Sequence, residues 1–401
     1  MATTTAELRV KLFNNFFEQE DDQRFVCEQQ IGKGGQSFVF KVKWYASFGT
    51  INSQRYYADV SELRWITLKV ASFANHDELD NLQAEAEVLK VLSGCAHTIH
   101  MHDVHDDPLQ GLKDQFAWAW IYLEYLPHGT LGQFIERYSM AGVSGIASQV
   151  QSPEASQAVS RAVSPSRSST LGFPTVSQLN YQSQTATGLF QAPTYVSSQL
   201  PTASQLGGLE TASPPRLPNR LLLKLFLCMV RACIAMAWPE HNRDGNPELA
   251  SRIPLGRPKN IKHNDIHMYN MMFGPLYDDE EHAKVPILKL IDFGLATMEG
   301  AVRSARQANV ADVGTLMATV MCALTDRRYS GEEIVLDLSD MELDEELETP
   351  ASRLLPDPDA RRPIDPLPDI DMDLRRVVAA CIASTPEKRP TLRWLENVST
   401  A

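Results

Sequence analysis

The sequence predicts an α+β protein in which strands come first, helices follow, and a long disordered insert interrupts the helical part. Short apolar runs at 66–70 and 121–123 have the length of buried strands. Residues 85–92 carry apolar side chains at helical spacing, and the apolar segments 221–227 and 312–320 predict buried helices. Runs of strands followed by runs of helices are typical of the α+β class.

A glycine-rich turn is the first motif in chain order. It contains Gly32 and Gly34 and runs into Ser37 and Val39. Glycine has no Cβ, so backbone N–H groups at such positions approach phosphate oxygens closely. An ordinary hairpin turn would contain the same glycines, so the motif gains weight only together with others.

A lysine, Lys69, lies inside the apolar strand predicted at 66–70. A buried ammonium group is costly unless it is paired, so Lys69 needs an acidic partner, and Glu85 in the helical segment is the candidate. Two alternatives stay open. Lys69 could lie on an edge strand, or Glu85 could be solvated while Glu87 is the more buried neighbour.

Composition changes abruptly between 141 and 215, where Ser, Thr, Gln, Ala and Pro dominate and charged residues are almost absent. Such a segment cannot bury enough apolar surface to offset the entropy lost on ordering, so we expect it to be disordered. It separates a helix expected to begin at 131 from the helix at 221–227, which makes it a surface loop rather than a linker between domains. Its Ser-Gln and Ser-Pro pairs are candidate phosphoacceptors, although a biased coil needs no such role.

The most informative phrases lie later, at 263–270 and 291–294. The first reads His-Asn-Asp-Ile-His-Met-Tyr-Asn and places Asp265 five residues before Asn270. That spacing lets one loop aim a carboxylate at a hydroxyl nucleophile while an amide oxygen faces a metal ion. The second reads Ile-Asp-Phe-Gly, follows a short apolar strand and offers Asp292 to the same metal.

These two phrases resemble the active site of the eukaryotic protein kinase family, whose pattern is H-R-D-L-x-x-x-N followed by D-F-G. The glycine-rich turn is similar to the family's G-x-G-x-x-G-x-V loop, with Ser37 in place of the third glycine, and the strand at 66–70 is similar to V-A-I-K. Residues 385–391, Thr-Pro-Glu-Lys-Arg-Pro-Thr, resemble the family's D-P-x-x-R-P-T ending. The motifs occur in the family's order and cover most of the chain outside 1–24 and 141–215.

The resemblance implies a bilobal kinase-like fold, with an N-terminal extension over 1–24, a mainly β N-lobe over 25–125 and a mainly α C-lobe over 126–400 that includes the insert. It implies an ATP-dependent phosphotransferase that moves the γ-phosphate of Mg-ATP to Ser or Thr of a protein, which the sequence does not identify. Asp265 would orient the acceptor hydroxyl and accept its proton, and His267 would face the transferred group. Lys69, fixed by Glu85, would position the α- and β-phosphates.

The same resemblance assigns the ligands of the cofactors, ATP and Mg²⁺. Asn270 and Asp292 would hold the metal. The residues implied around ATP, besides Lys69, are Ile31, Gly32, Gly34, Ser37, Val39 and Leu68, with backbone groups near Glu124 and Leu126 meeting the adenine.

The chain departs from the family in its catalytic loop. Asn264 replaces the arginine that normally pairs with a phosphorylated activation-loop residue, so switching by that charge pair is not expected. His267 stands where Ser/Thr kinases have lysine, and it carries a charge only when it is protonated.

The activation segment is also unusual, because only nineteen residues separate Asp292 from Asp312 and they contain no Ala-Pro-Glu motif. In the family this segment forms the shelf for a peptide substrate. Its glutamate pairs with the arginine corresponding to Arg389, so Arg389 needs another partner here. Asp312 would open a helix and brace the catalytic loop.

Composition excludes several other classes of function. A net charge of −13 argues against nucleic acid as a partner. Six cysteines without a C-x-x-C pair predict a reducing intracellular compartment, cytoplasmic or nuclear, and no zinc site. With no long apolar run and no basic-then-apolar start, we expect neither a membrane span nor a secretory leader. The sequence does not predict an oligomeric state.

Two other function classes stay open. A pseudokinase, which keeps the fold as a nucleotide-binding scaffold, suits the short activation segment but not the survival of Lys69, Asp265, Asn270 and Asp292. A small-molecule kinase of the aminoglycoside or choline kinase type suits that segment and the His-Asn-Asp loop, whereas the ending at 385–391 suits protein kinases.

Overall fold

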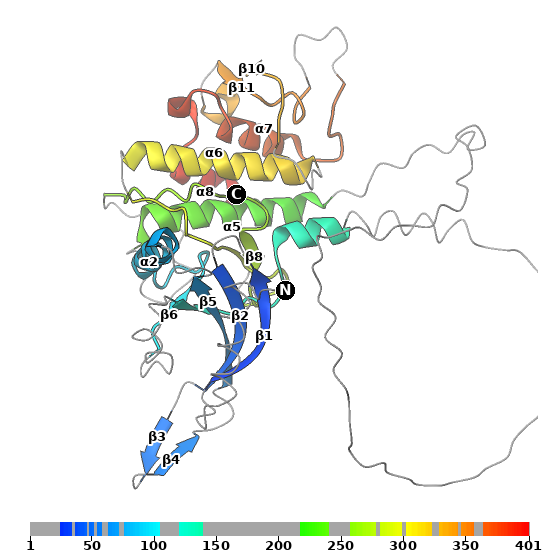
Figure 1. Ribbon diagram of the computed structural model, residues 1–401. Coiled ribbons are helices and arrows are strands. Elements are labelled where there is room, and N and C mark those ends of the chain that lie inside the picture. Colours follow the sequence, from blue (N-terminus) through cyan, green and yellow to red (C-terminus); the bar gives the residue numbers. More distant parts are fainter. Residues whose placement is uncertain are drawn as a thin grey trace, which may run out of the picture. The chain divides into compact units, whose positions relative to one another are not determined.

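The computed structural model (Figure 1) describes most of the chain outside the Ser/Gln-rich stretch. The described residues are 25–33, 37–45, 48–51, 54–57, 63–71, 76–104, 120–138, 217–239, 257–277, 281–298, 302–322, 329–343, 346–356 and 364–400. By its internal contacts the chain divides into Met1–Ala141 with Pro215–Ala401, and Gly142–Pro214. Every described residue belongs to the first of these units, and the expected disorder over 141–215 and the extension 1–24 lie outside the described residues.

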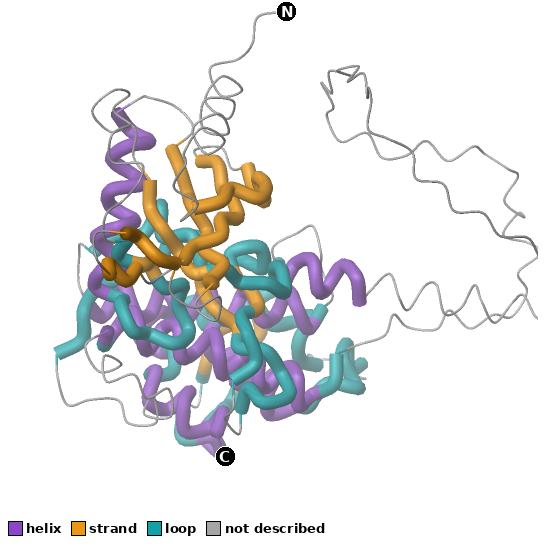
Figure 2. Tube along the Cα trace, turned by 90° about the horizontal axis from the view of Figure 1, so that it is seen from below, coloured by secondary structure: helices purple, strands orange, loops and turns teal. Residues whose placement is uncertain are grey.

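A five-stranded antiparallel sheet dominates the described part before Glu124. Its strands, in spatial order, are β1 (Phe25–Lys33), β2 (Ser37–Tyr45), β5 (Leu63–Ala71), β7 (Trp120–Glu124) and β6 (Met101–His102). A separate hairpin of β3 (Phe48–Ile51) and β4 (Gln54–Tyr57) lies between β2 and β5 in the chain. Helix α2 (His76–Val91) contacts β5, β6 and β7, and Figure 2 shows these strands gathered together in orange.

The sheet has two chemically different faces because side chains alternate along each strand. One face carries a buried apolar cluster of Phe38, Phe40, Val42, Ile66, Leu68, Val70, Trp120 and Tyr122. Thr67 and Lys69 are buried as well, but they alternate with these residues and so lie on the opposite face, with α2. Leu68, expected beside the adenine, therefore points into the apolar cluster, and Thr67 shares a face with Lys69.

Helices dominate after Glu124. They are a helix over 131–138, α5 (Asn219–Ala237), α6 (Val302–Met321), α7 (Met372–Cys381) and α8 (Leu392–Thr400). Two-stranded sheets join β8 (Met271–Phe273) to β9 (Leu288–Leu290) and β10 (Ile334–Leu336) to β11 (Leu347–Thr349), and 3-10 turns lie at η5 (Ser339–Met341) and η6 (Pro386–Lys388).

Helix α5 forms the centre of this core, since almost every residue after its first turn is buried. It packs against α6, α8 and β9, and Figure 1 shows α5 and α6 running side by side. No described helix is both long enough and apolar enough to cross a membrane.

Local capping explains where two of these helices begin. Thr130 Oγ1 accepts from Gln133 N–H at 3.2 Å, and Gln133 Oε1 accepts from Thr130 N–H at 3.1 Å, a reciprocal capping box at the start of the helix over 131–138. The carboxylate of Asp371 accepts from Leu374 N–H at 3.0 Å and caps α7.

The α+β class is confirmed, whereas two helix boundaries were wrong. Helix α2 begins at His76 rather than at Glu85, and α6 begins at Val302 rather than at Asp312. The first turns of both helices are largely polar, so their apolar spacing does not reveal them. As a result only residues 293–301 lie between Asp292 and α6.

Candidate functional site

Lys69 contacts two acidic side chains, Glu85 and Asp292. Its Nζ donates to both carboxylate oxygens of Glu85, at 2.9 and 2.7 Å, and to Asp292 Oδ1 at 2.8 Å. Strand β5 is third of five in the sheet, so Lys69 is not on an edge strand. Glu85 is 1% exposed, whereas the side chain of Glu87 is 62% exposed and pairs with Lys90. The predicted ion pair between Lys69 and Glu85 is therefore formed.

The pKa values in this cluster follow from burial and charge. Burial alone would lower the pKa of Lys69, but the carboxylates of Glu85 and Asp292 outweigh it and raise that pKa. Burial raises the pKa of Glu85, against the opposing attraction of Lys69. Asp292 is half-exposed, and although burial acts against ionisation, Lys69 lowers its pKa overall. Asp292 therefore presents an ionised carboxylate at a partly open position.

His263 joins the catalytic loop to the segment that carries Asp292. Its Nδ1 accepts from Asp265 N–H at 3.3 Å, so the proton lies on Nε2, which donates to the carbonyl of Ile291 at 3.1 Å. The ring also meets Phe293 edge-on, with centroids 4.7 Å apart. Burial lowers the pKa of His263 to about 4, so it is neutral at pH 7.

Asn309, on α6, braces the same loop from behind. It is 1% exposed, its Oδ1 accepts from His263 N–H at 3.1 Å, and its Nδ2 donates to Ile261 O at 2.9 Å. Bracing was expected from Asp312, one turn further along the helix. The sequence did not single out Asn309, because its role depends on the register of α6 against the loop.

The carboxylate of Asp265 is held by two neighbours. Asn270 Nδ2 donates to Asp265 Oδ2 and to its backbone oxygen, both at 3.0 Å. Because its amide nitrogen is engaged in this way, the oxygen of Asn270 is the atom that remains for a metal ion. His267 Nδ1 accepts from Tyr269 N–H at 3.2 Å, so its proton is on Nε2, 3.4 Å from Asp265 Oδ2. In this arrangement Nε2 of His267 faces the carboxylate of Asp265.

Asn264 connects the catalytic loop to the chain after Asp292. Its Nδ2 donates to Leu295 O at 2.9 Å and contacts Thr297 Oγ1 at 3.3 Å. Asn264 has φ 66°, in the left-handed region that asparagine tolerates better than most residues. Lys262 and Thr297 pair as an isolated antiparallel bridge beside it. This connection uses neutral groups and needs no phosphate.

The expected adenine side of the site contains a second buried ion pair. Glu124 accepts from Lys289 Nζ at 2.7 and 2.9 Å, and from His100 N–H at 2.7 Å. The backbone N–H of Glu124 donates to His100 O at 2.9 Å, so this N–H is not available to a ligand. Leu126 is buried two residues later.

The glycine-rich turn is described only at its two ends. Gly32 pairs with Val39 across β1 and β2, and a Cβ on Gly32 would lie 3.3 Å from Val39 Cβ, tighter than an ordinary contact. Ile31 is 41% exposed and Ser37 is half-buried. Gly34 lies outside the described residues.

A close contact beside Asp265 was missed in the sequence. A Cβ on Gly132 would lie 2.6 Å from the ring of Tyr269, so the helix over 131–138 can approach the catalytic loop only with glycine there. Tyr269 O–H donates to Glu136 Oε1 on the same helix at 2.7 Å. The sequence feature that could have indicated this contact is a glycine in the first turn of a predicted helix.

Arg389 donates to backbone carbonyls, and the nearby carboxylate of Asp312 favours its charged form. Its Nε donates to Ala383 O at 2.9 Å and its Nη1 to Gln307 O, on α6, at 3.0 Å. The ending of the chain is therefore fastened to α6 without an Ala-Pro-Glu glutamate.

Comparison with models of known protein families and with curated proteins found no match to this chain.

Proposed function

We propose that this chain is an ATP-dependent phosphotransferase of the protein kinase type, which transfers the γ-phosphoryl group of Mg-ATP to a hydroxyl group. One observation carries the proposal: Lys69, the buried Glu85 and the half-exposed Asp292 form a single ion-paired cluster while Asp265 and Asn270 share hydrogen bonds. These residues come from five separate positions along the chain and from both the sheet and the helical part. The bilobal arrangement of the kinase family belongs to this proposal.

The chain's own groups fit Mg-ATP in charge and in chemistry. Lys69 supplies a fixed positive charge for phosphate oxygens, and Glu85 keeps it from turning away. The carboxylate of Asp292 and the amide oxygen of Asn270 are hard oxygen ligands of the kind Mg²⁺ prefers. Bound Mg²⁺ would neutralise charge on the phosphates as the γ-phosphoryl group leaves.

In the transfer itself, Asp265 would accept a hydrogen bond from the acceptor hydroxyl and take its proton. The hydroxyl oxygen then bonds to the γ-phosphorus, and the bond to the β-phosphate oxygen breaks to release ADP. His267 and Asn270 would hold Asp265 in the required orientation, since both contact its Oδ2. His267 would therefore position the base rather than supply a charge to the phosphate.

The acceptor is either Ser or Thr of a protein or a small-molecule hydroxyl. Residues 293–301 are the whole connection between Asp292 and α6, so a peptide has little shelf to lie on. That observation favours a small acceptor. The segment 385–391, which is joined to α6 through Arg389, resembles protein kinases and favours a protein acceptor.

The test is phosphate transfer from γ-labelled Mg-ATP, offered to a mixture of protein substrates and separately to amino alcohols and aminoglycosides. We expect labelled product with wild type and a loss of about 10² to 10⁴-fold in rate for Asp265→Ala, which removes the general base. Asp373→Ala, at an exposed position on α7, is the matched control and should keep the full rate.

The outcomes distinguish the three classes of function. Labelled protein supports a protein kinase, and a labelled small molecule alone moves the proposal to that class. ATP binding with no transfer to any acceptor would overturn the proposed reaction and leave the nucleotide-binding scaffold. Transfer that survives in Asp265→Ala would overturn the role of Asp265 as the base.

A further inference from the structure

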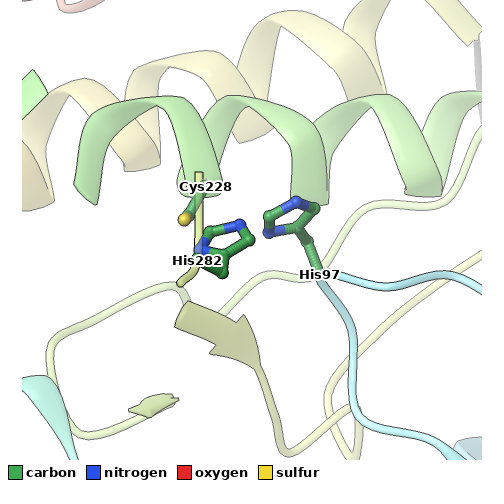
Figure 3. Close-up of side chains that lie close together, drawn as sticks. All are labelled: His97, Cys228 and His282. Carbon is green, nitrogen blue, oxygen red and sulfur yellow. The ribbon is translucent and has the colours of Figure 1, made fainter. Parts of the chain in front are cut away.

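A second cluster of chemically reactive side chains lies outside the site described above. His97 follows α2, Cys228 lies on α5, and His282 lies in the loop before β9 (Figure 3). All three are buried, and one ligand atom from each lies within 4.8 Å of the others. The imidazoles of His97 and His282 are 5.6 Å apart between centroids. These residues are far apart in sequence, and folding alone brings them together.

Both histidines are oriented by backbone carbonyl groups. Nδ1 of His97 lies 3.3 Å from Leu288 O, and Nδ1 of His282 lies 3.3 Å from Val285 O. A carbonyl oxygen only accepts hydrogen bonds, so each Nδ1 carries the proton and each Nε2 keeps the lone pair that can bind a metal. Nε2 of His282 also lies 3.8 Å from Glu281 Oε2. Metal-binding histidines almost always have their other ring nitrogen held in this way.

The surroundings favour the uncharged forms of His97 and Cys228 in the absence of a cation. Burial, helped by the charge of Arg231, holds the pKa of His97 well below its ordinary range, so its imidazole is neutral. Burial raises the pKa of the Cys228 thiol to about 12, although the backbone of Leu288 and the charge of Arg231 favour the thiolate. Arg231 itself pairs with Glu281, Nη2 to Oε1 at 2.8 Å, so this neighbouring pair adds little net charge.

We propose that His97, Cys228 and His282 are three ligands of a Zn²⁺ ion, with water in the fourth position. Two imidazoles and a thiolate form a borderline-soft set of the kind that selects zinc over Mg²⁺ or Ca²⁺. On binding, Zn²⁺ replaces the proton of the Cys228 thiol, and that proton leaves to solvent. The site is distinct from the Asp292 and Asn270 pair, which offers only oxygen ligands.

The position of the cluster gives the ion a structural role. The backbone oxygen of His97 accepts from Leu290 N–H at 2.9 Å, and Leu290 O accepts from Ile99 N–H at 2.9 Å. Leu290 ends β9, two residues before Asp292. Zinc would therefore link α5 to the segment after α2 and to the loop before β9. This link lies next to β9, the strand that leads to Asp292.

The first experiment measures metal content by elemental mass spectrometry on full-length protein, produced in zinc-supplemented medium and dialysed against a weak chelator. We expect one zinc ion per chain in wild type and none in Cys228→Ala. Cys233→Ala is the matched control, because Cys233 lies on the same helix and is equally buried but is not in the cluster, so this variant should keep its zinc.

Cobalt provides a second measurement that does not depend on the folding of a variant. Protein produced with Co²⁺ in place of zinc should show a thiolate-to-cobalt charge-transfer band, absent from Cys228→Ala and from His282→Gln wherever these fold. Wild type that contains no zinc and shows no such band overturns the proposal, as does stoichiometric copper or iron in place of zinc. Zinc retained in both Cys228→Ala and His282→Gln would place the metal elsewhere and equally overturns it.

Discussion

Replacing Lys69 with methionine removes the cation that neutralises two carboxylates, and the structure indicates which carboxylate is destabilised more. Asp292 has a side chain that is half exposed, so water can solvate its charge once Lys69 is gone. Glu85 is 1% exposed and has no comparable access to water. Removing one member of a buried ion pair typically costs about 3 to 5 kcal/mol. We therefore expect Lys69→Met to lower the free energy of unfolding by roughly 3 kcal/mol at pH 8, mainly through Glu85.

The same structure predicts how that loss depends on pH. Burial already raises the pKa of Glu85 above 4.5, and Lys69 opposes this shift, so the variant should have a still higher pKa at Glu85. Between the unfolded and the folded pKa, the native variant holds a proton that the unfolded chain has released. The free energy of unfolding then falls as pH rises. The deficit of Lys69→Met should therefore be smaller at pH 5 than at pH 8.

The assay is urea unfolding followed by circular dichroism at both pH values, with three further variants. Glu85→Gln should lose less than Lys69→Met, because Lys69 remains paired with Asp292 at 2.8 Å. The double variant should recover part of the loss, since no isolated buried carboxylate remains. Lys90→Met removes an exposed partner on α2 and should change stability by no more than about 0.5 kcal/mol. If Lys69→Met is as stable as wild type at pH 8, or the double variant is no better than Lys69→Met, the reasoning about Glu85 is refuted.

Three further outcomes follow from the same site and fold. The free energy of unfolding should fall as pH drops from about 6.5 towards 4, because His263 takes up a proton in the unfolded chain but stays neutral in the folded protein. The contribution of His263 to this fall is roughly 3 kcal/mol, and His263→Asn should flatten that part of a profile of melting temperature against pH. Replacing Thr297 and Ser304 with alanine should leave phosphotransfer unchanged, since Asn264 keeps its bond to a backbone carbonyl; a double variant that binds ATP but loses transfer would show a phosphoswitch. Deleting 142–214 should leave the melting temperature within a few degrees, because that composition offers no core; collapse of the fold would contradict it.

The sequence predicted best those elements whose signal is local. Residues 221–227 are apolar except for Lys224, and they lie in the first half of α5, which is buried throughout from Leu225 onward. The first turns of α2 and α6 carry mainly polar or small residues, and both were missed. Their helical state depends on packing further along the helix, so spacing within the first turn gives no sign of it.

The same distinction applies to the site. Asp265 and Asn270 lie in one loop, and their five-residue spacing placed both at one site, although it did not predict the hydrogen bond between them. Lys69 and Glu85 were paired from an isolated charge on an apolar strand and the need to neutralise it. Asn309 was not found, because an asparagine within a helix acquires its role only from the loop that packs on it.

The alternation of side chains along β5 also indicates which neighbours share a face with Lys69, and the kinase motifs alone did not reveal this. Thr67 and Lys69 are two residues apart and so share a face, whereas Leu68 points to the other one. The cluster of His97 and Cys228 is a different case. The absence of a C-x-x-C pair led to the prediction of no zinc site, but it says nothing about ligands that come from distant positions, and the proposed zinc site departs from that prediction.

The most direct test of the central claim is Mg²⁺-dependent binding of ATP, measured by isothermal titration calorimetry. We expect wild type and Lys90→Met to bind ATP with Mg²⁺ present and much more weakly without it. Lys69→Met should lose binding because its phosphate contact is gone, and Asp292→Asn should lose the dependence on Mg²⁺ because its charged ligand is gone. If wild type shows no difference between the two conditions, or if both variants bind as wild type does, then Lys69 and Asp292 do not form a nucleotide site and the proposed function is wrong.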